Sequence, residues 1–78
     1  MQAVTIRDTD KFSLVSFGRG FAFSFTNKCA ARTVFVQGDD ASTFDADLDH
    51  YEIAFDRTDD ALTHLWCDYD SVSVPVIS

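Results

Sequence analysis

The sequence predicts an α+β fold, in which an antiparallel β-meander of three to four strands is packed on one face by two C-terminal helices. The apolar residues recur at every second position before Gly38 and with a helical period after it. Short turn-forming segments separate the expected strands, which favours antiparallel neighbours over crossover connections. The 78 residues are expected to form one domain, spanning residues 1–78.

An alternating segment predicts the central strand. Its three phenylalanines occupy every second position: Phe21, Phe23 and Phe25. Side chains at such positions point to the same face of a strand, so we expect all three in the core. The opposite sheet face is expected to be small, polar and open to water, and its residues are Ala22, Ser24, Thr26, Thr33 and Gln37.

Further strands are expected on both sides of this segment. Residues 11–17 precede it, and residues 31–37, which are rich in β-branched side chains, follow it. Residues 3–7 are a candidate for a fourth, edge strand. Residues 71–78 also alternate, but Pro75 restricts them to a sheet edge or an extended tail.

Turns are expected at residues 18–20 and 26–28. Gly18 and Gly20 tolerate positive φ angles, which tight turns often require. In the second turn, Asn27 is the residue expected to adopt the left-handed conformation.

Two helices are expected after Gly38. In the first, the apolar residues follow one buried face, and they are Ala41, Phe44, Leu48 and Tyr51. Asp39 or Asp40 is expected to cap this helix. The second helix is expected at residues 58–69, with Thr58 as its cap. Its apolar stripe is made of Leu62, Leu65, Trp66 and Tyr69.

The charge is distributed unevenly along the chain. Residues 1–38 have a net charge of +3 and residues 39–78 one of −10, which gives −7 overall. Residues 38–52 hold six carboxylates and no lysine or arginine. Like charges four residues apart destabilise a helix by about 0.2–0.5 kcal/mol per pair. Selection for solubility alone would interleave lysine, so we favour a functional acidic surface over a merely solubilising one.

The first helix is expected to present this surface. Asp45, Asp49 and Glu52 form one strip at i, i+4 and i+7, and Asp47 borders the other side of the buried face. A step of four residues is about 6 Å along a helix, which is near the spacing of phosphates along a DNA strand. A groove that binds phosphates through lysine and arginine would accept such a lattice.

The residues predicted to contact a partner lie on both helices. Tyr51 is the expected aromatic anchor beside the charges. The complete candidate set is Asp39, Asp40, Asp45, Asp47, Asp49, Tyr51, Glu52, Asp59 and Asp60.

Neither catalysis nor a metal or other cofactor is expected. Cys29, His50, His64 and Cys67 lack the paired spacing of a zinc site, and no group orients Cys67 as a nucleophile. The two cysteines are expected to be reduced and buried. No membrane span or signal peptide is apparent, so a cytoplasmic location is expected.

Two segments resemble small proteins of bacteriophages and prophages. They are VFVQGDDASTFDADLD (residues 34–49) and LWCDY (residues 65–69). A short acidic chain with a β-meander followed by helices also resembles phage anti-CRISPR proteins and other DNA mimics. The resemblance implies a protein that binds the positively charged DNA-binding surface of a CRISPR effector (surveillance) complex in the bacterial host and blocks target DNA.

That resemblance also implies a protein partner rather than direct nucleic-acid binding, and we expect a monomer rather than a dimer. The alternative is a phage protein–protein interaction or assembly module without DNA mimicry. Salt and DNA would abolish binding in the first case, whereas binding would survive moderate salt in the second.

Overall fold

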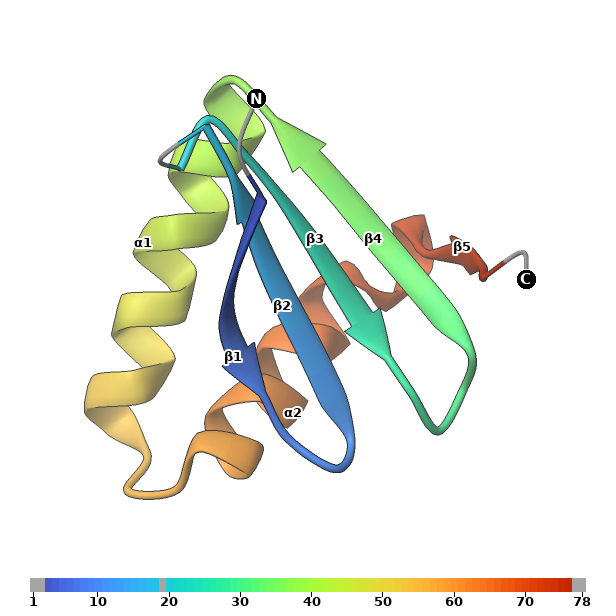
Figure 1. The fold of residues 1–78 in the computed structure, drawn as a ribbon. Coiled ribbons are helices and arrows are strands. Elements are labelled where there is room, and N and C mark those ends of the chain that lie inside the picture. Colours follow the sequence, from blue (N-terminus) through green and yellow to red (C-terminus); the bar gives the residue numbers. More distant parts are fainter. Residues whose placement is uncertain (1–2, 19, 77–78) are drawn as a thin grey trace.

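The computed structural model describes residues 3–18 and 20–76, and within them a four-strand antiparallel meander is followed by two helices (Figure 1). The strands are β1 (Ala3–Asp8), β2 (Phe12–Phe17), β3 (Ala22–Asn27) and β4 (Arg32–Gln37). After α1 (Asp39–Ala54) and α2 (Thr58–Tyr69), a 3₁₀ turn η1 (Asp70–Val72) leads into the short strand β5 (Val74–Pro75). The predicted α+β class and both helices are confirmed.

Both helices lie against one face of the sheet, and the core fills the space between the two layers (Figure 1). Phe25 is fully buried, and its ring centroid lies 5.6 Å from that of Phe44 in α1 and 5.4 Å from that of Trp66 in α2. Phe23 stacks on Phe44 at 5.2 Å. Alternating strand residues and helical stripes therefore meet as their periods predict.

The prediction for Phe21 is wrong, since its side chain is 54% exposed. The strand β3 begins one residue later, at Ala22, and Phe21 belongs to the turn that leads into it. The Phe21 amide donates to the carbonyl of Gly18, and the Phe21 carbonyl accepts from Gly38. Strand alternation does not govern a turn residue, so Phe21 stays outside the core.

The outer face of the sheet is not the small, polar surface predicted. Phe17, Val15 and Phe35 lie on this face, and Phe35 is 58% exposed. The rings of Phe17 and Phe35 contact each other edge to face, with centroids 6.0 Å apart. The prediction failed because it considered the central strand, whereas its neighbours β2 and β4 supply these apolar side chains.

The predicted helix caps are also wrong, by one residue at Asp39 and Thr58 and by two at Asp40. Gly38, with φ of +63°, precedes α1, and its carbonyl accepts from the amides of Ala41 and Ser42. Asp39 and Asp40 instead occupy the first helical turn, where the helix dipole still favours their charge. Arg57 precedes α2, and Thr58 is its first residue.

The turn between β3 and β4 differs from the prediction as well. Its residue with positive φ is Ala31, at +54°, rather than Asn27. The Asn27 carboxamide oxygen accepts from the amides of Cys29 and Ala30, so its side chain organises the turn without a left-handed backbone. The turn predicted at residues 18–20 includes Arg19, which lies outside the described residues.

The two edges of the sheet confirm two further predictions. Residues 3–7 form the edge strand β1, which pairs with β2. Pro75 lies in β5 at the opposite edge, where β5 pairs with Arg32 and Thr33 of β4. No helix in the described part of the chain is long and apolar enough to cross a membrane.

Candidate acidic binding surface

The helical layer holds most of the charge of the molecule. Between Asp39 and Asp70 there are eleven carboxylates against the single cation Arg57. The buried stripe of α1, at Phe44 and Leu48, divides the carboxylates of that helix into two groups. One group faces β1 and the other faces α2.

The predicted phosphate-like residues form the group that faces β1, which we name the β1-side strip: Asp45, Asp49 and Glu52. Glu52 is bound by Arg7 of β1 through two hydrogen bonds, Nε to Oε2 at 2.7 Å and Nη2 to Oε1 at 2.8 Å. The hydrogen bonds that Arg7 donates to Glu52 raise the pKa of Arg7, although partial burial opposes the shift. Asp45 and Asp49 are exposed. Among the described residues, no cation forms an ion pair with either of these two carboxylates.

The other group joins both helices, and we name it the interhelical cluster: Asp40, Asp47 and Asp68. The Tyr69 hydroxyl donates to Asp47 at 3.1 Å, and the Tyr51 hydroxyl donates to Asp68 at 2.6 Å. Within residues 3–18 and 20–76, the ion pairs are Arg7–Glu52 and Lys28–Asp8, so no cation is paired with this cluster. The described part of the chain therefore leaves the negative charge of this cluster uncompensated.

The two tyrosines respond to these carboxylates. Burial, then the hydrogen bond to Asp47, raises the pKa of Tyr69 to about 12, and the charges of Asp47, Asp68 and Asp40 add to the shift. The hydrogen bond to Asp68 raises the pKa of Tyr51. Both hydroxyls therefore stay protonated at neutral pH and donate to the carboxylates without reducing their charge.

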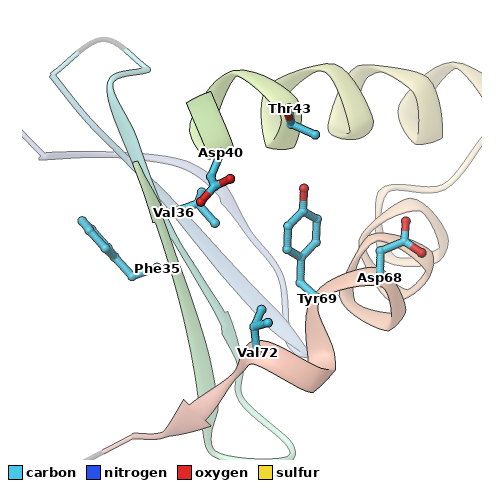
Figure 2. Close-up of a pocket in the computed structure, with 7 residues that line it drawn as sticks. All are labelled: Phe35, Val36, Asp40, Thr43, Asp68, Tyr69 and Val72. Atoms are coloured by element: carbon cyan, nitrogen blue, oxygen red, sulfur yellow. The ribbon is translucent and has the colours of Figure 1, made fainter. Parts of the chain in front are cut away.

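A cleft of about 380 Å³ opens beside this cluster (Figure 2). Its lining comes from β4, the first turns of α1, the end of α2 and η1: Phe35, Val36, Asp40, Thr43, Asp68, Tyr69 and Val72. In Figure 2 the ring of Tyr69 stands between β4 and Asp68, with its hydroxyl directed towards α1. The cleft therefore combines apolar walls with two exposed carboxylates.

The remaining candidate residues lie at the ends of the helices. Asp39 is exposed at the start of α1, whereas Asp60 is exposed and Asp59 half-buried at the start of α2. The starts of the two helices lie at opposite ends of the helical layer (Figure 1). Tyr51 is half-buried against the core, so much of its ring is already occupied within the protein.

The candidate set drawn from the sequence leaves out three residues of this surface: Arg7, Asp68 and Tyr69. Tyr69 was assigned to the apolar stripe alone, and Arg7 is too distant in sequence to be paired with Glu52. Asp68 did carry a signal, because a carboxylate in the last turn of a helix opposes the helix dipole. Asp70 follows it and accepts a hydrogen bond from the Trp66 indole at 3.1 Å.

Cys29 and Cys67 are both free, in agreement with the predicted reduced thiols, but their predicted burial is wrong, since both are exposed. Cys29 lies in the β3–β4 turn, and Cys67 follows Trp66 by one residue, which rotates it about 100° out of the buried stripe. His64 stacks on Phe55 with ring centroids 4.3 Å apart. Among the residues that the structure describes, no group of three or more His, Cys, Asp or Glu side chains is placed to hold a metal ion.

Comparisons with protein-family models, with curated proteins and with solved structures found no significant match for this chain.

Proposed function

We propose that this protein inhibits a nucleic-acid-binding protein by occupying its positively charged groove in place of DNA. The observation that carries the proposal is the interhelical cluster, in which carboxylates from two helices gather around Tyr69 and none of the described residues pairs a cation with them. A protein that needed only solubility would gain by placing lysine or arginine there. The cost of the like charges is explained if a basic partner supplies the missing cations.

The arrangement on two helices suits a phosphate-binding groove. Carboxylates on neighbouring helices present charge in two dimensions, and helices held by a common core keep those charges fixed. Long-range attraction steers such a surface to a basic channel, and salt screens that attraction. Asp45 and Asp49 extend the charge to the other side of α1, and Asp39 and Asp60 extend it towards the helix ends.

The resemblance to phage DNA mimics points to a CRISPR effector complex as the partner, acting in the cytoplasm of a bacterial host. Such complexes hold target DNA in positively charged channels, and the protein reads a short adjacent motif. An acidic protein in that channel excludes DNA by competition. In this proposal the chain has no catalytic role and needs no cofactor.

A panel of bacterial strains with different active CRISPR systems tests the proposal. Expression of the chain is expected to restore plaque formation by a targeted phage in at least one strain. The purified effector of that strain should then fail to shift target DNA in a gel, and excess DNA or raised salt should reverse the inhibition. The proposal is overturned if no strain is rescued and no salt-sensitive partner is captured from the lysates.

The outer sheet face favours a second candidate, an interaction module without DNA mimicry. The outward-facing residues of β2, β3 and β4 carry no charge, and Phe17 and Phe35 contact each other there. Depletion of charged residues around aromatic side chains is typical of interface centres. If this face is the functional one, Phe17→Ser abolishes partner binding that persists in moderate salt, and changes in the interhelical cluster do not.

A further inference from the structure

The outer edge of β4 is only half covered. β5 pairs with Arg32 and Thr33, and the Val76 amide donates to the Ala31 carbonyl. Beyond Thr33, the part of the chain that the structure describes places no strand beside β4. Residues 34–37 therefore form an open sheet edge.

The backbone register identifies the open hydrogen-bonding groups. In an antiparallel pair, successive residues direct their backbone N–H and C=O groups to alternate sides. The Gly38 amide donates to Phe21 on the β3 side, and the Ala31 carbonyl accepts from β5 on the other side. By this alternation, Val34 and Val36 bond to β3, whereas Phe35 and Gln37 direct their backbone groups to the open edge.

The cleft reaches this same edge. It is lined by both Phe35 and Val36, whose side chains lie on opposite faces of β4, so it passes along the backbone between them (Figure 2). Val72 on its far wall is 63% exposed and Phe35 is 58% exposed. Asp40 and Asp68 stand at its sides. Backbone groups, apolar walls and carboxylates therefore converge at one place.

We propose that this edge binds an extended, basic segment of the partner protein as an additional strand on β4. Backbone pairing with Phe35 and Gln37 would supply orientation, as in other complexes formed by strand addition. An apolar side chain of the segment enters the cleft against Val36 and Val72. Lysine or arginine side chains beside it meet Asp40 and Asp68. The partner's basic character rests on the proposed function, whereas the edge and the cleft do not.

The charges at the cleft determine the choice of occupant. A second copy of the chain pairing edge to edge would bring Asp40 and Asp68 near their own counterparts, and like charges across an interface are unfavourable. An acidic segment would meet the same repulsion. A basic segment neutralises both carboxylates, for which the described residues supply no cation.

The opposite edge of the sheet lacks these properties. β1 contains an irregularity in its pairing between Thr5 and Arg7, and a bulge of this kind discourages further strands from adding. The guanidinium of Arg7 is bound to Glu52. Bulges and charged side chains are the usual protection of exposed edges, and residues 34–37 of β4 carry neither.

A peptide titration tests this inference on the full chain. The probe is a capped synthetic peptide of alternating arginine and valine. Its binding to the ¹⁵N-labelled protein is followed by NMR and by the hydrogen exchange of the protein's amides. At saturation, exchange at Phe35 and Gln37 is expected to slow by about tenfold or more, as strand pairing protects these amides. Two control peptides, one methylated at every internal amide and one with glutamate in place of arginine, are expected to bind at least about tenfold more weakly.

Variants of the protein provide the matched comparison. Phe35→Pro removes an amide that the fold does not use, at an edge that tolerates proline, and should weaken peptide binding about tenfold. Asp40→Asn with Asp68→Asn should weaken it similarly. Asp10→Asn with Asp56→Asn removes the same charge from two exposed loop positions that do not line the cleft, and should change affinity by no more than about threefold.

Several results would overturn the inference. One is that the methylated peptide binds as tightly as the unmethylated one. Another is that the amides of Phe35 and Gln37 stay unprotected at saturation with peptide. The third is that a folded Phe35→Pro variant binds the peptide as tightly as the wild type. If Phe35→Pro does not fold, the methylated peptide decides the question on the wild-type chain. Protection of Phe35 that rises with protein concentration in the absence of peptide would assign the edge to a second copy instead.

The same experiments separate this inference from the proposed function. A DNA-competitive, salt-sensitive partner whose binding ignores both Phe35→Pro and the Asp40/Asp68 changes would leave the proposed function intact and remove the strand-addition site. If the peptide pairs with Phe35 but the chain blocks no DNA-binding protein, the strand-addition site stands and the proposed function is removed.

Discussion

On the side of α1 that faces β1, Glu52 is bound by Arg7 at 2.7 and 2.8 Å, whereas on the side that faces α2 Asp47 and Asp68 accept hydrogen bonds from tyrosine hydroxyls. The two sides hold similar numbers of carboxylates, but a guanidinium cancels charge and a hydroxyl does not. For a similar number of carboxylates, the interhelical cluster therefore presents more net negative charge to a partner than the β1-side strip does. Counting carboxylates along a helix does not reveal this difference.

The largest expected effect comes from the residue that both sides share. Phe44 is fully buried and contacts Phe23, Phe25 and Tyr69, with ring centroids 5.2 to 5.6 Å apart. Phe44→Ala is expected to lower the free energy of unfolding by about 3–5 kcal/mol. Urea denaturation followed by Trp66 fluorescence measures the change. Ile53→Ala, on the 86% exposed surface of the same helix, should stay within about 0.5 kcal/mol of the wild type.

Charge reversal on each side tests the comparison directly. Asp40→Lys with Asp68→Lys and Asp45→Lys with Asp49→Lys each change the net charge from −7 to −3. If the proposed function holds, the first pair should weaken partner binding about tenfold more than the second, mainly through slower association. Surface plasmon resonance at two salt concentrations separates the rates. If the second pair causes the greater loss of partner affinity, the main contact is the β1-side strip, as the sequence predicts.

Glu52 is left out of this reversal for a structural reason. A lysine at that position would face Arg7 and would add a local repulsion to any effect on binding. The sequence alone suggests that Asp45, Asp49 and Glu52 are interchangeable surface charges. The structure shows that only the first two can be changed without disturbing a contact between α1 and β1.

An alkaline titration examines the tyrosine contacts of the interhelical cluster. The pKa of Tyr69 is about 12 in the folded protein, against about 10 in an unfolded chain. The unfolded chain therefore loses this proton first, so the associated stability is present below about pH 10 and is lost as the pH rises towards 12. Urea denaturation across this range should show a steeper decline for the wild type than for Tyr69→Phe. If the free energy of unfolding falls with pH equally in both proteins, the raised pKa of Tyr69 is contradicted.

The same variant has a smaller effect at neutral pH. Tyr69→Phe removes the donor to Asp47 and should cost about 0.5–1.5 kcal/mol of stability. The apolar ring contact with Phe44 remains, so the fold is expected to persist.

The smallest expected effect concerns Arg7. Arg7→Met should cost about 0.2–1 kcal/mol of stability, since its ion pair with Glu52 is partly exposed to water. It should also strengthen binding to a basic partner by about two- to threefold, because the β1-side strip regains its charge. Lys28→Met is the matched control, since it gives the same net charge but frees Asp8, outside the helical layer. Equal gains from both variants would show that only net charge matters.

Local patterns predicted most of the fold because each depends on neighbouring residues. Alternation at Phe23 and Phe25 and the helical spacing of Phe44 and Leu48 identify which face of each element is apolar, and packing the helices on the sheet buries these faces together. Predictions failed where a residue lies at the boundary of an element, as at Phe21 and Asn27. There the register of the adjacent turn, rather than the period, decides where the side chain goes.

By itself, the sequence determined the class of the fold, the two helices and the concentration of carboxylates after Gly38. These properties follow from periodicity and composition, which are local. Only the tertiary structure decided that Arg7 binds Glu52, that Asp68 joins Asp40 and Asp47, and that β4 keeps an open edge beside them. Each depends on the distance in space between segments far apart in the chain, and the packing of two helices on a twisted sheet sets that distance.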